Sequence, residues 1–352
     1  MQHLQKYSQI NHNSKNSIGS FMEKNINNKI DFVITWVDGN DKNWLKEKNE
    51  YLNIKGDSNV NRFRDFDNLQ YLFRGIDKYA PWVNNVFFIT WGHLPSWLDI
   101  TNPKLRIVNH KEFIPEEYLP TFNSNVIEMN LNRIEDLSEN FVLFNDDLFI
   151  LNKLKENDFF EKNLPRDYYV EYVKKNPSKR HQIMRKNYYD VIDNHFEKKS
   201  VLKANMSKIL NISYGKYIFN NISSLKNKGF NDFLDLHATQ TFNKSTFNKA
   251  WEMEPVKLDE ACKNRFRANN DMGKNICRYI HLLEGKFRPY ILKSKYFEIS
   301  NDNNKLIKHI KCRKSKIICI NDAKVDIDFE TCKKEINNAL NSVLPEKSSF
   351  EK

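Results

Sequence analysis

The stretch NFVLFNDDLFI, from Asn140 to Ile150, joins a run of branched and aromatic residues to a pair of carboxylates. The apolar run predicts a buried strand that places Asn145, Asp146 and Asp147 at its end. Two adjacent carboxylates beside an apolar run are costly unless a cation, or a bound Mg²⁺ with phosphate oxygens, offsets their charge. The pattern therefore indicates a metal–phosphate site. A surface turn that caps a helix is the alternative, since Asn and Asp are common in turns.

Length and composition limit the class of protein. The chain has 352 residues, of which 40% are hydrophobic, so it can bury a large core in one elaborated domain or two. No run approaches the roughly 18 apolar residues of a membrane span. The N-terminus lacks the apolar segment of a secretion signal, and we expect a cytoplasmic protein. Five cysteines without a CxxC pair favour neither a disulfide framework nor a zinc site.

The formal net charge of +11 is unevenly distributed. Residues 151–230 hold 17 Lys and Arg against 8 Asp and Glu, so most of the excess lies in this segment. A solvated helical face is one interpretation, and a surface for an anionic polymer or an anionic membrane is the other. No RNP, zinc-finger or KH pattern accompanies the charge, so we expect no nucleic-acid partner. The residues that would form this surface are Lys174, Lys175, Lys179, Arg180, Arg185 and Lys186.

Strand and helix patterns alternate in the first half of the chain. Strands are predicted at 31–37, 86–90 and 105–108, and amphipathic helices at 69–76 and 124–137. This order implies a largely parallel sheet, whose ligands gather at the carboxyl ends of the strands. Asp38 and Asp146 both stand at such ends.

The organisation along the chain is predicted in five parts. A polar tail over 1–28 is expected to be disordered. The α/β catalytic core is expected over 29–157 and again over 234–300, with a helical segment at 272–283. Between the two parts, 158–233 is predicted to be a basic helical insertion without strand alternation. A C-terminal extension over 301–352 should contain a strand at 315–320 and a helix at 329–344.

Four blocks of sequence, taken in order, resemble the conserved regions of a known family. The first is DFVITWVDGND from Asp31, and the second begins with RFRDFDNLQ at Arg62 and runs through FNSNVIEMNLNRI to FVLFNDD. The third is LHATQTFNKS from Leu236, and the fourth is RFRANNDMGKNICRYIHLLEG from Arg265. Together they are similar to the Stealth proteins. This family comprises bacterial capsular polysaccharide hexose-1-phosphate transferases and the lysosomal-enzyme N-acetylglucosamine-1-phosphotransferases.

The resemblance implies a glycosyltransferase-A-like (Rossmann-like) core with a mostly parallel sheet. It implies an enzyme that moves a sugar 1-phosphate from a UDP-sugar to a hydroxyl of a polysaccharide or lipid-linked glycan, with release of UMP. Peripheral contact with the inner face of the cell membrane is expected. The short chain and the lack of animal recruitment modules favour a capsule or cell-wall acceptor. Two alternatives stay open: a metal-dependent glycosyltransferase that releases UDP, and a non-enzymatic polyanion-binding protein.

The resemblance also assigns roles at the reaction centre. Asp146 matches the catalytic Asp of the family, and Asp146 with Asp147 would hold Mg²⁺ (or Mn²⁺) against the diphosphate. His237 matches the histidine of the third block and is the candidate general base on the acceptor hydroxyl. Arg267 matches the arginine of the fourth block and suits bidentate phosphate binding. The alternative for Arg267 is a salt bridge to Asp271 at a helix start.

Further residues are candidates for donor binding. Gly39 allows close approach of the backbone to a nucleotide, and a neighbouring carboxylate can accept hydrogen bonds from ribose or uracil. The candidates at 62–65 have a structural alternative, a charge cluster before the helix at 69–76. Those at 123–128, where Ser124 also stands, could instead cap and staple the helix at 124–137. The full set is Asp38, Gly39, Arg62, Arg64, Asp65, Asn123, Glu128, Arg265 and Asp271. The loop after His237 lacks the proline that many relatives have, which leaves its geometry open.

Overall fold

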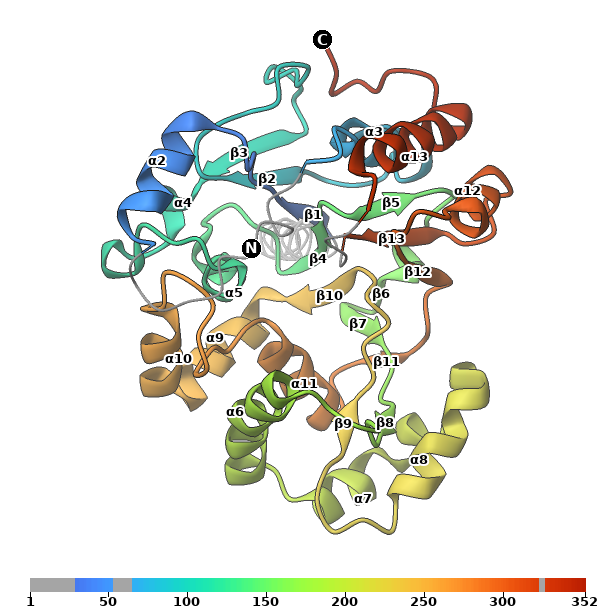
Figure 1. The fold of residues 1–352 in the computed structure, drawn as a ribbon. Helices are drawn as coiled ribbons and strands as arrows, with labels where there is room; N and C mark the ends of the chain where they lie inside the picture. The colour runs from blue at the N-terminus through green and yellow to red at the C-terminus, as the bar shows by residue number, and fades with distance from the viewer. Residues whose placement is uncertain (1–28, 53–64, 323–326) are drawn as a thin grey trace, which may run out of the picture.

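A five-stranded sheet forms the centre of the computed structural model, which describes residues 29–52, 65–322 and 327–352 (Figure 1). β1 pairs in parallel with β2 and β4, β2 pairs in parallel with β3, and β10 joins the edge antiparallel to β4. The mostly parallel α/β core expected from the sequence is confirmed. The predicted tail over 1–28 and the candidates Arg62 and Arg64 lie outside the described residues. In sheet order the strands are β10 (Gln240–Asn243), β4 (Asn140–Asn145), β1 (Ile30–Thr35), β2 (Val86–Thr90) and β3 (Leu105–Asn109).

The central strands β1, β2 and β4 are buried along almost their whole length because both faces of the sheet are covered. On β1, Phe32 and Ile34 face a core that contains α3, α12 and α13. Val33, which points to the opposite face, belongs to a second core with α5, α9 and α11. In the register of β1 and β4, Thr35 lies opposite Asn145. The carboxyl ends of these two strands are therefore side by side, and Asp38 and Asp146 follow them.

The stretch from Asn140 to Ile150 is two strands rather than one. β4 ends at Asn145, and β5 (Leu148–Ile150) belongs to a second sheet, in which it pairs antiparallel with β13 (Ile317–Asn321). β12 (Ser294–Glu298) pairs in parallel with β13. The main-chain NH of Ile320 donates to the carbonyl of Asp147 at 2.8 Å. The Asp146–Asp147 turn thus links the two sheets, and the partner strand lies too far along the chain for periodicity to reveal it.

The helix predicted over 124–137 is much shorter than expected. α5 ends at Met129, and a 3₁₀ turn follows. The Asn130 side chain donates to the carbonyl of Val126 at 2.9 Å, so it satisfies a carbonyl that a continuing helix would use. The helices predicted near 272–283 and 329–344 are confirmed as α11 and α13, and the strand near 315–320 as β13.

The segment 158–233 contains short strands at both ends, so the prediction of strand-free helical structure there is wrong. β7 lies between β6 and β11, and β8 pairs antiparallel with β9. Strands of two to four residues are too short to give an alternating pattern. They are β6 (Phe160–Glu161), β7 (Leu164–Asp167), β8 (Glu171–Tyr172), β9 (Asp232–Phe233) and, after the insertion, β11 (Arg288–Pro289).

Helices fill the middle of the insertion, as predicted, and cover the sheets elsewhere. None of the helices in the described part of the chain has the length and apolar character of a membrane span. The α-helices are α2 (Lys42–Glu50), α3 (Leu69–Tyr79), α4 (His110–Phe113), α5 (Ser124–Met129), α6 (Lys179–His195), α7 (Lys198–Ile209), α8 (Ile218–Ser224), α9 (Lys244–Met253), α10 (Pro255–Cys262), α11 (Asn275–Leu283), α12 (Asn304–Lys311) and α13 (Phe329–Val343). The 3₁₀ helices are η2 (Glu116–Tyr118), η3 (Leu131–Arg133), η4 (Glu156–Asp158) and η5 (Ile212–Tyr217).

Candidate active site

Asp147 has one carboxylate oxygen held by the protein and one that is not. Its Oδ2 accepts from the Cys319 thiol at 3.2 Å and from the Asn321 amide at 3.5 Å, both on β13. Its Oδ1 is buried without a hydrogen-bond partner among the described residues. Burial raises the pKa of Asp147. A buried carboxylate oxygen without a donor is costly, so this position favours a ligand that supplies positive charge.

Asp146 stands in a crowd of negative charge. Desolvation of its carboxyl by the surrounding protein, together with the negative charges of Asp147 and Asp65, raises the pKa of Asp146 to about 7. Its side chain is exposed, so water screens part of this effect. Asp65 lies in turn near Asp38, and burial, Asp67 and Asp38 raise the pKa of Asp65. Carboxylates that follow β1 and β4 and one that precedes α3 therefore share one region of negative potential.

The turn after β1 is fixed by hydrogen bonds of its own. The main-chain NH of Asp38 donates to Nε2 of His93 at 2.7 Å, and the Asp38 carboxylate accepts from the NH of Asn40 at 2.8 Å. Burial lowers the pKa of His93, which keeps the ring neutral and able to accept this bond. Gly39 lies in the turn between them. The predicted nucleotide contacts at Asp38 and Gly39 are thus on an ordered loop next to Asp65.

His237 comes from a distant segment and lies near Asp147. A protonated His237 acts against the effect of burial on the pKa of Asp147. The imidazole is exposed and packs on the ring of Tyr296, with 4.9 Å between ring centroids. The φ angle of His237 is +47°, an uncommon backbone conformation for a residue other than glycine, and its NH donates to Asp235 at 2.8 Å. The loop before β10 is therefore held in a specific shape beside the aspartates.

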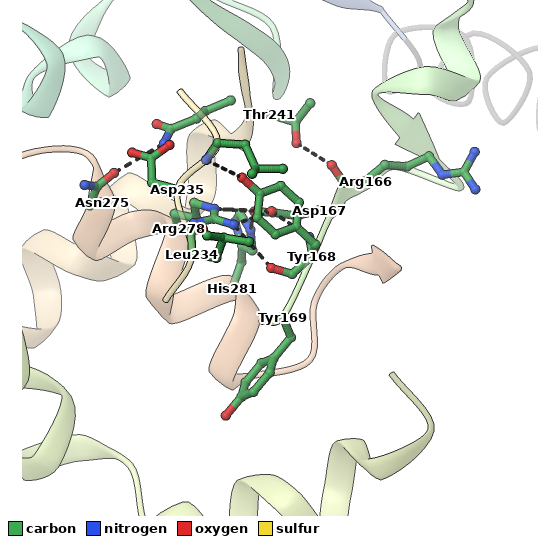
Figure 2. A network of polar contacts seen from close by, with 12 residues as sticks. Arg166, Asp167, Tyr168, Tyr169, Leu234, Asp235, Thr241, Asn275, Arg278 and His281 are labelled. Atoms are coloured by element: carbon green, nitrogen blue, oxygen red, sulfur yellow. Dashed lines mark hydrogen bonds and ion pairs between the residues drawn. The ribbon is translucent and has the colours of Figure 1, made fainter. Parts of the chain in front are cut away.

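A buried polar network contacts the backbone of this loop (Figure 2). Arg278 of α11 donates to Asp167 at 2.8 Å and to the carbonyl of Leu234 at 3.0 Å. The hydroxyl of Tyr168 accepts from the NH of Leu236 at 3.1 Å. Burial alone would raise the pKa of Asp167, but Arg278 and His281 hold the pKa of Asp167 well below its usual range. The backbone just before His237 is thus anchored at two points, at Leu234 by the Arg278 guanidinium and at Leu236 by the Tyr168 hydroxyl.

A second group of predicted residues gathers at the start of α5. Asn123 caps this helix, and its amide donates to Asp271 at 3.0 Å. Arg267 donates to the hydroxyl of Ser124 at 2.7 Å, and its charge opposes the effect of burial, which raises the pKa of Asp271. The structural alternative for Asn123 is therefore present. Arg267 lies near Asp271, and its half-buried guanidinium is oriented by the bond to Ser124.

Glu128 and Arg265 complete this second group. Lys274 forms an ion pair with Glu128 at 2.8 Å. Arg265 donates to the carbonyl of Leu119 at 3.0 Å and stacks over the ring of Tyr51 at 4.9 Å. The predicted residues thus form two groups: the carboxylates with His237, and the cluster that joins α5 to the loop before α11.

The carboxylate group fits a divalent cation that keeps its own water. In the described ranges, no set of three or more His, Cys, Asp or Glu side chains is arranged to hold a metal. Mg²⁺ does not require such a set, because it usually binds through one or two carboxylates and takes its other ligands from water and substrate phosphates. The Oδ1 of Asp147 has no hydrogen-bond partner within the described ranges, and the pKa of Asp146 is raised; such an ion would relieve both.

Sequence reasoning missed Tyr168 and Arg278. Both act on main-chain atoms of the loop, at Leu236 and Leu234, and any residue supplies such atoms. Arg278 does lie within the fourth conserved block, which was the one available signal. Tyr168 stands in the segment that was expected to be helical.

Comparison with known proteins gives consistent results. The family model for conserved region 2 of Stealth proteins matches residues 62–167, and that for conserved region 1 matches residues 28–56. A capsular polysaccharide phosphotransferase, WcwK, of Streptococcus pneumoniae is 42% identical over 328 residues, which cover 92% of this chain and 99% of WcwK. The exopolysaccharide phosphotransferase cps2G of Lactiplantibacillus plantarum is 38% identical over 326 residues, which cover 92% and 96% of the two chains.

Solved structures give a more distant likeness. The galactosyltransferase LgtC, in complex with donor and acceptor sugar analogues, is 10% identical, with a TM-score of 0.37 and coverage of 88% of this chain and 95% of LgtC. The apo form of the glycosyltransferase GlyE of Streptococcus pneumoniae has a TM-score of 0.36 at 8% identity, with coverage of 92% and 64%. At these values nothing about activity follows from the likeness.

Proposed function

This chain belongs to the Stealth family of polysaccharide phosphotransferases, and we propose that it transfers a sugar 1-phosphate from a UDP-sugar to a hydroxyl group of a glycan. In this reaction the acceptor oxygen attacks the phosphorus that carries the sugar. The bond from this phosphorus to the oxygen of UMP breaks, and UMP leaves. A phosphodiester forms, and the bond between the anomeric carbon and its oxygen stays intact. The proton of the acceptor hydroxyl must pass to a base.

Two observations carry the proposal: the negative charges of Asp147 and Asp65 act on Asp146, and the Oδ1 of Asp147 is buried without a hydrogen-bond partner in the described part of the chain. Phosphoryl transfer depends mostly on positioning and on neutralising spread charge. Carboxylates alone would repel a diphosphate, so they are useful here only if they hold a cation. We propose Mg²⁺ (or Mn²⁺) on Asp146 and Asp147, where the ion would neutralise the charge of the diphosphate.

His237 is the proposed general base. It is exposed, it lies near the proposed metal ligand Asp147, and its loop is anchored by Tyr168 and Arg278. Imidazole is the side chain most often used to take a proton from an attacking hydroxyl. A fixed backbone on one side of the ring gives the base a defined direction, which proton transfer requires.

Arg267 is the proposed ligand of the donor phosphates. Its hydrogen bond to Ser124 orients the guanidinium, whose remaining N–H groups can form the paired contacts that phosphate oxygens accept. The cluster of Asn123, Asp271 and Arg265 then acts as the frame of this arginine and of the nucleotide site. The turn at Asp38 and Gly39 is the proposed contact for the ribose or the base.

The acceptor is proposed from the relatives. Their names specify capsular polysaccharide and exopolysaccharide. We propose a polysaccharide or a lipid-linked glycan as the acceptor, and peripheral contact of the enzyme with the inner face of the cell membrane, where such a glycan would be assembled.

The identity of the released nucleotide tests the proposal. The protein is incubated with a panel of UDP-sugars, Mg²⁺ and glycan acceptors, and the nucleotides are separated by ion-exchange chromatography. UMP is expected, together with phosphorus in the glycan product. UDP, with no phosphorus in the glycan, would instead establish the metal-dependent glycosyltransferase alternative.

A further inference from the structure

A segment inside the insertion is strongly cationic. Residues 198–231 contain seven lysines and no Asp or Glu. Lys198 is buried in an ion pair with Glu171 and serves the fold. Five others are exposed, and they point into solvent from α7, from η5 and from the turn after α8: Lys199, Lys203, Lys216, Lys226 and Lys228. The segment therefore presents positive charge that no acidic residue of its own neutralises.

The same segment exposes large apolar side chains. Ile212 is 90% exposed, Phe219 is 70% exposed and Ile222 is 51% exposed. With Met206, they make up four of the nine large hydrophobic side chains that are exposed in the described residues, although the segment is only about a tenth of the chain. Single apolar residues at a surface are ordinary, but a local group of them marks a contact site.

α8 turns polar side chains toward the protein and apolar side chains outward, the opposite of a helix that packs on a hydrophobic core. Its buried residues are Asn221 and Ser224. The amide of Asn221 donates to the carbonyls of Tyr169 at 2.6 Å and Ile209 at 2.7 Å. Phe219 and Ile222, one turn apart, share the outward face. The helix is thus fixed to the protein by polar contacts and leaves its apolar side to the surroundings.

The position of α8 makes this face accessible. α8 packs against β8 and η5, and Figure 1 shows it at the periphery of the molecule, far from the five-stranded sheet. Ile212 lies in η5, next to α8. We define the tip face as the outward side chains of Ile212, Phe219 and Ile222 together with Lys216, Lys226 and Lys228.

We infer that the tip face binds the surface of an anionic phospholipid bilayer. Phe and Ile can enter the boundary between headgroups and acyl chains, while lysines contact lipid phosphates. A polyanionic glycan would match the lysines but not the exposed isoleucines, Ile212 and Ile222, which offer neither a hydrogen bond nor a flat ring to a sugar. This inference deepens the membrane contact that we propose, yet it does not depend on the phosphotransferase reaction. Vesicle binding needs no donor, so a failure of either claim would leave the other standing.

Co-sedimentation of the full chain with vesicles tests the inference. The vesicles contain phosphatidylcholine alone or an equal mixture with phosphatidylglycerol. Phe219→Ser with Ile222→Ser removes the apolar face, and Lys226→Gln with Lys228→Gln removes charge. The matched controls are Val256→Ser on α10, where the side chain is 67% exposed, and Lys308→Gln with Lys311→Gln on α12. Circular dichroism and the thermal midpoint verify that each variant is folded.

We expect binding to the anionic vesicles only, and a loss of about tenfold or more in partitioning for both tip-face variants. The controls should bind like the wild type. The inference is overturned if the wild type does not bind anionic vesicles, or if the Phe219 and Ile222 changes leave binding unaltered. It is also overturned if dextran sulfate, a probe for polyanions, binds as tightly as the vesicles do and binding depends on the lysines alone.

Discussion

Replacing Asp146 with Asn should stabilise the folded protein and slow the reaction. The pKa of Asp146 is raised from 3.8 to about 7, so the charged form is disfavoured in the folded state. The loss of stability from ionising this carboxyl in the folded state is absent below the unfolded pKa, near 4. It grows as the pH rises and is complete above about pH 7. The free energy of unfolding of the wild type should therefore fall across this window, whereas the Asn variant lacks this part of the decline.

The magnitude follows from exposure. Because water reaches the Asp146 side chain, we expect the free energy of unfolding of the Asn variant to exceed that of the wild type by no more than about 1 kcal/mol at pH 8. For a chain of this size, this is a rise of about 2 °C in Tm. Calorimetry at pH 5 and pH 8, in metal-free buffer, measures it. Mg²⁺ should raise the Tm of the wild type at pH 8 and have less effect on the variant. Asp193→Asn, at an exposed position on α6, is the control.

Turnover should change in the opposite direction. Losing one carboxylate of the proposed metal site should lower kcat by about 10²-fold or more, which corresponds to about 2.7 kcal/mol in the activation barrier. Initial rates of nucleotide release at saturating donor and Mg²⁺ provide the assay. The reasoning is refuted if the variant keeps a rate within about threefold of the wild type, or if its Tm falls by the same amount at both pH values.

Three further experiments test the roles of the general base and the phosphate ligand, of Tyr168, and of the buried ion pair. His237→Ala should abolish transfer and leave the affinity for the donor within about threefold, whereas Arg267→Ala should weaken both transfer and donor affinity. Calorimetric titration with UDP-sugar measures the affinity. If the His237 variant fails to bind the donor and the Arg267 variant binds it normally, the two roles are wrongly assigned. Tyr168→Phe removes the acceptor of the Leu236 NH and should lower kcat about fivefold with KM unchanged. Tyr290→Phe, which loses a hydrogen bond to Asp158, is the control. An equal loss of kcat in both variants would argue against a positioning role for Tyr168. Lys198→Met leaves the buried Glu171 carboxylate without its cation and should destabilise the insertion by about 3–5 kcal/mol, seen as faster proteolysis within 198–231; unchanged cleavage would contradict this.

The central sheet could be predicted because its strands carry their own signal. Parallel strands covered on both faces carry near-continuous apolar runs, as at 32–34 and 141–144. The short strands near Leu164 and Glu171 could not be predicted, because β7 pairs with β11 and β8 pairs with β9, both from distant segments. The end of α5 depends on a side-chain bond from Asn130, which competes with helix continuation and leaves no mark in the apolar pattern.

The candidate site was predictable where chemistry requires a particular side chain. The Asp146–Asp147 pair and His237 were identified from sequence blocks, and the fold brings Asp147 and His237 together. Their supporting residues were not identified. Cys319 and Asn321 contact Asp147 only because β13 pairs with β5, and Tyr168 contacts a main-chain NH. Such contacts depend on tertiary packing rather than on local pattern.

The fate of the anomeric oxygen tests the central claim most directly. A UDP-sugar donor carrying ¹⁸O between the anomeric carbon and phosphorus is turned over with the acceptor, and ³¹P nuclear magnetic resonance with mass spectrometry locates the label. Transfer of a sugar 1-phosphate predicts that the label stays in the glycan, in a phosphodiester, while the released UMP is unlabelled. Label found in released UDP would show attack at the anomeric carbon and would contradict the account.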